Sequence, residues 1–169
     1  MEKLRRPQDN WRDIIFGSVV VFVVIADQIT KALIRASLLP GEALYDVGFF
    51  RIMHVQNTGA SFGLFEGHSI VIVITSIIGI LVILFLVFFF RERWSFLQSN
   101  WVIVAMAMVT GGTIGNNLID RLRQGHVTDF LDFKVWPAFN VADMCITVGV
   151  ILLAYRLIFY SDLLKSKND

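Results

Sequence analysis

The segment "SIVIVITSIIGILVILFLVFFF", residues 69–90, contains no charged side chain over its whole length. As an α-helix it would be about 33 Å long, which is enough to cross the roughly 30 Å hydrocarbon core of a bilayer. Because a charge-free run of this length is typical of a transmembrane helix, it predicts a membrane protein.

Three more apolar segments have a suitable length. They run from about 14 to 36, from 101 to 119 and from 138 to 160. The sequence therefore predicts an all-α membrane protein with four transmembrane helices, in which residues 1–169 form a single integral membrane domain. Hydrophobic residues make up 56% of the chain, against about 45–50% in soluble domains. The net charge of +1 gives no indication of nucleic-acid binding.

The basic residues indicate the orientation, because Lys and Arg are enriched in cytoplasmic loops. With four spans, both termini and the loop between the second and third spans lie on one side. That side carries nine basic residues: Lys3, Arg5, Arg6, Arg12, Arg91, Arg93, Arg156, Lys165 and Lys167. The other side carries six: Lys31, Arg35, Arg51, Arg121, Arg123 and Lys134. Both termini are therefore predicted to be cytoplasmic.

In this topology the polar side chains gather at the outer ends of the spans. They are Asp27, Asn57, Asn116, Asn117, Asp120, Asp129, Asn140 and Asp143. One polar site near the outer leaflet accounts for all of them. The loop at 39–67 also contains "FFRIMHVQ", which predicts a short strand or hairpin on the membrane surface, with His54 as a surface residue.

The sequence offers few candidate nucleophiles. Ser61, Ser69 and Ser76 have no suitably placed Lys or His, and Cys145 is expected to be a small apolar packing residue. No set of His and Cys has the spacing of a metal site, so no metal or other cofactor is predicted.

Two carboxylates remain. Asp143 lies several residues into an apolar helix, where a charge is costly and is a functional candidate, although a structural hydrogen bond to a neighbouring helix is the alternative. Asp129 lies in the loop "HVTDFLDF". Two carboxylates that approach closely do not both ionise, so one can activate water while the other protonates a leaving amine. The pair predicts peptide hydrolysis.

Other polar residues have structural interpretations. Asp27 and Lys31 are spaced for an ion pair along one helix. Asp120 and Arg121 are expected to fix the outer end of the third span through contacts with loops. Asn140 either caps a helix or orients a substrate. In "TGGTIGNN", Gly111, Gly112 and Gly115 allow helices to approach closely.

Several motifs together carry a family resemblance. "DQITK" (27–31), "NTGASF" (57–62), "GGTIGNNLIDR" (111–121), "HVTDF" (126–130) and "FNVAD" (139–143) occur in that order. The whole chain resembles bacterial lipoprotein signal peptidases, which are intramembrane aspartic endopeptidases. The resemblance implies a small extracytoplasmic β-cradle between the first two spans. It also implies removal of the signal peptide from diacylglyceryl-modified prolipoproteins, cut just before the lipidated cysteine.

The resemblance also implies residue roles. The catalytic pair would be Asp129 and Asp143, with Asn57, Gly112, Asn116, Asn117, Arg121 and Asn140 binding substrate or supporting the site. Asp27, Lys31 and Asp120 would be structural. The expected partners are a lipidated prolipoprotein and membrane lipids. The protein is expected to be a monomer in the bacterial inner membrane.

One position departs from the family pattern. The glycines of "GGTIGNNLIDR" align Asn116 with the family asparagine, whereas the spacing to Asp120 and Arg121 aligns Asn117. A one-residue insertion in a helix can be absorbed as a π-bulge. The sequence leaves both assignments open.

Two other functions fit the sequence less well. A small four-span proton-coupled exporter would need acidic residues near the membrane midplane and commonly has an internal repeat. Here the acids gather at one face and no repeat is evident. A non-enzymatic assembly factor would leave Asp129 and Asp143 without a shared purpose.

Overall fold

The computed structural model describes residues 10–59 and 68–159; residues 60–67 of the loop at 39–67, including Ser61, lie outside them. Within the described residues, four helical segments are long and apolar enough to span a membrane, as predicted. They are α1 (Asn10–Ser37), α2 (Ser69–Phe85) continued by η3 (Leu86–Phe90), α3 (Asn100–Thr113) continued by η5 (Ile114–Asp120) and α4 (Arg121–Gln124), and α5 (Val141–Ile158). A short 3-10 helix, η4 (Ser95–Gln98), precedes α3.

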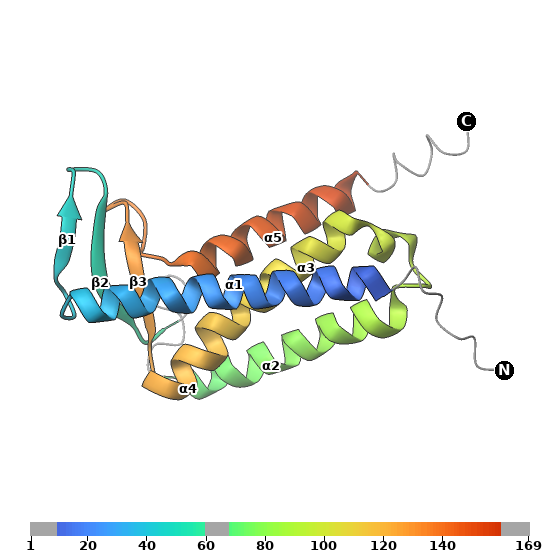
Figure 1. Cartoon of the computed structure of the whole chain (residues 1–169), viewed down its shortest axis with the longest axis horizontal. Helices are drawn as coiled ribbons and strands as arrows, with labels where there is room; N and C mark the ends of the chain where they lie inside the picture. The colour runs from blue at the N-terminus through green and yellow to red at the C-terminus, as the bar shows by residue number, and fades with distance from the viewer. Residues whose placement is uncertain (1–9, 60–67, 160–169) are drawn as a thin grey trace.

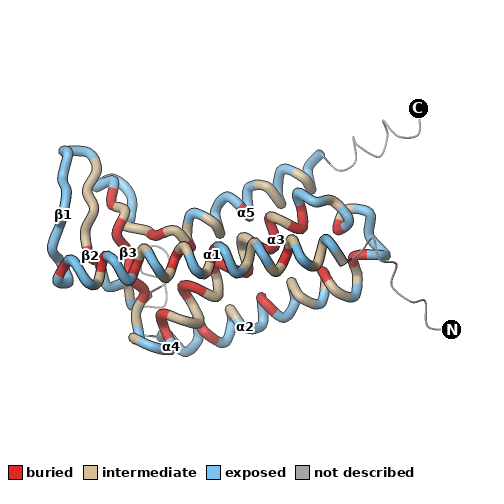
Figure 2. The backbone as a smooth tube through the Cα atoms, viewed as in Figure 1, coloured by how far each residue is buried: buried red, intermediate tan, exposed pale blue. Residues whose placement is uncertain are grey.

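The α3 helix is the central element of the bundle (Figure 1). In the most apolar 18-residue stretch of the span that contains α3, 56% is buried. The corresponding shares in the other three spans are 17%, 22% and 11%. In those three, exposed positions outnumber buried ones (Figure 2). Many of the exposed residues are large and apolar. This pattern suits a bundle whose outer surface faces lipid, because lipid rather than protein then covers the apolar side chains.

Glycines set the close packing around α3, as predicted. A Cβ on Gly112 would lie 2.6 Å from the main-chain oxygen of Ala142 on α5, and one on Gly111 would lie 2.9 Å from Cβ of Val23 on α1. Neither position has room for a larger side chain. The backbones can therefore approach to a distance that only glycine permits.

A three-stranded antiparallel sheet lies at one end of the bundle (Figure 1). Its strands are β1 (Ala43–Asp46), β2 (Arg51–Asn57) and β3 (Val127–Asp132), in that order. The predicted hairpin corresponds to β1 and β2. The third strand was not predicted, and Asp129 lies on it rather than in a loop. Almost every residue of β3 is buried, so the strand lacks the alternation of a half-exposed strand.

Three helix ends differ from the expected boundaries. The first helix begins at Asn10 rather than near 14. The third span continues to Gln124 rather than ending near 119, and Gly125 terminates it in the left-handed conformation with φ 76°. The last helix begins at Val141 rather than near 138. The residues just before it are extended, because Phe139 pairs with Leu131 through main-chain hydrogen bonds of 2.9 and 3.0 Å. This bridge joins the start of α5 to β3.

The expectation that His54 is a surface residue was wrong. His54 is buried, and its Nδ1 lies 2.9 Å from the main-chain oxygen of Leu38. Strand β2 is covered on one side by the end of α1, so a position that looks like an exposed strand residue is enclosed by the preceding helix. His54 links the sheet to the bundle.

Candidate active site

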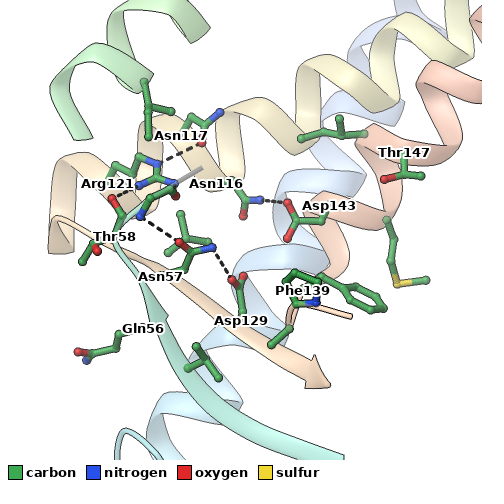
Figure 3. Close-up of a pocket in the computed structure, with 18 of the residues that line it drawn as sticks. Gln56, Asn57, Thr58, Asn116, Asn117, Arg121, Asp129, Phe139, Asp143 and Thr147 are labelled. Atoms are coloured by element: carbon green, nitrogen blue, oxygen red, sulfur yellow. Dashed lines mark hydrogen bonds between the residues drawn. The ribbon is translucent and has the colours of Figure 1, made fainter. Parts of the chain in front are cut away.

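A pocket of about 1050 Å³ opens where the sheet meets the helices (Figure 3). Its lining comes from β2, β3, η5 and α5, with Ile72 of α2 on one side. Asp129 and Asp143 both line it. The fold therefore brings the two carboxylates singled out in the sequence to one cavity.

Asp129 is positioned by the sheet. It pairs with Val55 across β2 and β3 and is almost fully buried. Its two carboxylate oxygens accept hydrogen bonds from amide side chains, at 2.9 Å from Nδ2 of Asn57 and at 2.6 Å from Nδ2 of Asn140. Burial, and then the charge of Asp143, raise the pKa of Asp129 to about 7. Asp129 therefore changes protonation near neutral pH.

Asp143 is positioned by the first turn of α5. Asn140 is the N-cap residue: its side-chain oxygen accepts from the main-chain nitrogen of Asp143 at 3.0 Å. In return, the main-chain nitrogen of Asn140 donates to Asp143 Oδ2 at 3.2 Å. This reciprocal capping box fixes the Asp143 carboxylate as part of the helix start. The other oxygen, Oδ1, accepts from Nδ2 of Asn116 at 2.7 Å.

Asn140 therefore contacts both carboxylates. Its amide nitrogen donates to Asp129, while its oxygen and main-chain nitrogen hold Asp143. The side chain is completely buried. Of the two roles left open for Asn140, the structure shows the helix cap. The same cap ties Asp129 to Asp143.

The two neighbouring asparagines have different partners. The segment Ile114–Asp120 is a π-helix, which is the kind of distortion expected for one inserted residue. Asn116 points to Asp143, whereas Asn117 donates to Ser76 of α2 at 2.9 Å and accepts from Nε of Arg121 (Figure 3). Both line the pocket. Of these two asparagines, only Asn116 is hydrogen-bonded to one of the two carboxylates, that of Asp143.

Behind Asn116 lies a buried charge cluster. Lys31 is fully buried and contacts Asp27 at 2.8 Å and Asp120 at 2.7 Å. It also donates to the side-chain oxygen of Asn116. This bond orients the amide of Asn116 so that its nitrogen faces Asp143. The predicted pair of Asp27 and Lys31 is present, but Asp120 contacts α1 rather than a loop.

Asp27 has a second role at the start of α5. Its Oδ1 accepts from the main-chain nitrogen of Ala142 at 3.1 Å, so it satisfies one of the free N–H groups of that helix end. A Cβ on Gly115 would lie 2.5 Å from Asp27 Oδ2, so this glycine makes room for the carboxylate. Through Asp27, the buried charge cluster is therefore hydrogen-bonded directly to the helix that carries Asp143.

Arg121 contacts the loop that follows β2, which agrees with the prediction that it bonds to a loop. Its guanidinium donates to the main-chain oxygens of Thr58 and Gly59. Gly112, in contrast, packs against α5 and does not line the pocket. Within residues 10–59 and 68–159, no group of three His, Cys, Asp or Glu side chains is placed to hold a metal ion. Cys145 is half-buried.

Two residues that support the site were not predicted from the sequence, Gln28 and Ser76. Gln28 donates to Asp27 at 3.1 Å and to Asp120 at 2.9 Å. Ser76, considered only as a nucleophile, links α2 to Asn117. Gln28 lies inside the "DQITK" motif, so its proximity to Asp27 was a usable signal. Ser76 is a lone hydroxyl in an apolar run and offered none.

Comparison with known proteins identifies the relatives of this arrangement. Residues 19–159 match the family described as Signal peptidase (SPase) II. The chain belongs to the signal peptidase II family. The match spans all four helices and the sheet.

Individual relatives agree. The lipoprotein signal peptidase of Dehalococcoides mccartyi is 43% identical over 84% of this chain and 88% of its own length. That of Caldanaerobacter subterraneus is 42% identical over 83% of this chain and 94% of its own length. A solved bacterial membrane enzyme superposes with a TM-score of 0.73 at 30% identity, covering 91% of this chain and 90% of the other.

Family membership establishes the coarse biochemistry. The chain is a protease of the signal peptidase II family, which cleaves the signal peptides of lipoproteins, and it is a multi-pass membrane protein. Membership in a peptidase family favours this function over the exporter and the assembly factor.

Proposed function

We propose that Asp129 and Asp143 form the catalytic dyad and cut the peptide bond just before the lipid-modified cysteine of a prolipoprotein. The observation that carries this proposal is the shared contact with Asn140, which holds both carboxylates at one pocket. One carboxylate takes a proton from water, and the hydroxide oxygen bonds to the scissile carbonyl carbon. The other carboxylic acid then protonates the leaving amine as the C–N bond breaks.

The surroundings support substrates that carry lipid. The pocket lies at the sheet end of an otherwise apolar bundle, and β1 and the turn that comes after it expose Leu44, Tyr45 and Phe49. Apolar side chains at this edge favour contact with the outer leaflet. Diacylglyceryl chains would remain in lipid while the peptide enters the pocket.

Incubation of the purified protein in detergent with matched prolipoproteins tests the activity. We expect cleavage of the diacylglyceryl-modified substrate, with the lipidated cysteine as the new N-terminus, and no cleavage of the unmodified one. Chelators should leave the rate unchanged, because the proposed mechanism needs no metal. Mass spectrometry of both products locates the cut; a cut at another bond, or equal cleavage of the two substrates, would contradict the proposal.

We propose that the protein acts in the inner membrane. Both of its termini lie in the cytoplasm in the proposed orientation. Single cysteines at Glu92, in the turn after η3, and at Val47, in the turn between β1 and β2, should label from opposite sides in a Cys145→Ala background. An impermeant thiol reagent added to spheroplasts should modify position 47 only. Labelling of position 92 would reverse the topology and move the site to the cytoplasmic side.

The pH dependence should reflect the protonation of Asp129. Because its pKa is raised to about 7, the carboxyl carries its proton below that pH and loses it above. A dyad that needs one proton is therefore expected to lose kcat/KM as pH rises through about 7. Initial rates between about pH 5 and 9 measure this limb. A flat profile over the same range would contradict the need for one proton on the pair of Asp129 and Asp143.

A further inference from the structure

The hydroxyl of Thr147 in the pocket differs from the hydroxyls of the other threonines in the described helices. Of the five threonines in the helices of residues 10–59 and 68–159, four donate to the main-chain oxygen four residues earlier. These are Thr30, Thr75, Thr110 and Thr113, with distances of 2.9, 2.9, 2.8 and 2.7 Å. The fifth, Thr147, lines the pocket, and no described residue accepts its hydrogen bond.

Thr147 lies four residues after Asp143, so the two side chains share one face of α5. Figure 3 shows Thr147 one turn further along the helix, beside the same pocket. Other residues that line the pocket, Ile72 and Val148 among them, are apolar. Thr147 is exposed, and at membrane depth lipid offers its hydroxyl no hydrogen-bond partner, so the donor is free to bind whatever fills the pocket.

The substrate also has main-chain groups that lack hydrogen-bond partners in the bilayer. A signal peptide crosses the membrane as a helix, but its backbone must be extended at the bond that is cut. Unwinding frees main-chain carbonyls at the end of the helix, and these also find no water in the bilayer. A hydrogen-bond donor in the wall of the pocket satisfies one of them.

Geometry gives the position of that carbonyl. Four residues of helix rise about 6 Å, and an extended chain advances about 3.3 Å per residue. In the proposed orientation, Thr147 lies deeper in the membrane than Asp143, on the side where the signal peptide enters. We propose that the Thr147 hydroxyl donates a hydrogen bond to a main-chain carbonyl of the signal peptide about two residues before the cleaved bond.

This inference rests on the proposed function, since it takes Asp143 as the reference for the cleaved bond. It makes Thr147 a substrate-binding residue that favours an extended backbone at that depth. The recognition is independent of side-chain identity, because every residue carries the same carbonyl. Specificity for side chains would have to come from other parts of the pocket.

Thr147→Val keeps the shape and removes the donor, whereas Thr147→Ser keeps the donor. With the lipidated prolipoprotein, Thr147→Val should lower kcat/KM by about 3- to 10-fold, the amount expected for one hydrogen bond. Thr147→Ser should stay within about 2-fold of wild type. The matched control is Thr75→Val, whose hydroxyl bonds within its own helix outside the pocket. It should not change kcat/KM.

Substrates with a thioamide at each of the three peptide bonds before the cleaved bond, one at a time, locate the acceptor. Sulfur accepts hydrogen bonds weakly, so one of these substrates should be cut several-fold more slowly by the wild type but not further slowed in Thr147→Val. Unchanged kcat/KM in Thr147→Val, failure of Thr147→Ser to restore it, or additive losses at all three positions would overturn the inference. Full cleavage by Asp143→Asn would instead refute the dyad.

Discussion

Asp129→Asn and Asp143→Asn should each lower the rate of cleavage by roughly 10³-fold or more, because each keeps the size of the side chain but cannot exchange a proton. The double variant should cost little more than either single variant, since residues that act as one unit have strongly non-additive effects. Binding of the lipidated substrate should largely survive. Single-turnover rates and a separate binding measurement distinguish the two quantities.

Asp132→Asn is the matched control on the same strand. Asp132 pairs with Arg51 in the sheet and does not line the pocket, so cleavage should be unchanged. The assignment of the dyad would be wrong if Asp129→Asn cleaved at a near wild-type rate while Asp120→Asn was folded and inactive. Asp120 would then replace Asp129 as the partner of Asp143.

Lys31→Met should have the largest effect on stability. The substitution leaves Asp27 and Asp120 buried together without their cation. Breaking a buried ion pair from one side costs about 3–5 kcal/mol, since the remaining charge has no compensation. Thermal unfolding in detergent and the yield of folded protein should both fall. Asn116 would also lose the donor that orients it, so any folded protein should cleave slowly.

Lys134→Met provides the comparison for the same chemical change. Lys134 is bonded to Asp46 in an exposed pair, and such pairs contribute little to stability because solvent screens the two charges, so the unfolding temperature should barely change. Neutralising the whole buried cluster, with Asp27→Asn and Asp120→Asn added to Lys31→Met, should recover part of the lost stability. A Lys31→Met protein that unfolds at the wild-type temperature would show that the cluster is not important for folding.

Elements with long apolar runs were predicted well from the sequence. Residues 69–90 indicated a spanning helix without further information, and the cost of burying Asp143 in an apolar segment marked it as a functional candidate. The hairpin of β1 and β2 was also predictable, because Arg51–Asn57 has strand composition.

Features created by contacts between distant segments were not predictable. Strand β3 is enclosed on both faces, so its residues lack the usual alternation, and Asp129 looked like a loop residue. His54 is covered by the end of α1, which no local pattern indicates. The choice between Asn116 and Asn117 depended on the π-helix, whose register appears only in three dimensions.

The bridge between Leu131 and Phe139 has a consequence for inhibition. One carboxylate belongs to the sheet and the other to the bundle, and this short main-chain pairing is one of the contacts that hold the two parts together, beside those of His54 and Asn140. Separating the sheet from the bundle would move Asp129 away from Asp143 without a chemical change to either carboxylate. A small molecule that binds between Leu131 and Phe139 and breaks their pairing is therefore expected to inactivate the enzyme by separating the two carboxylates. It would need no resemblance to a peptide, a lipid or a transition state.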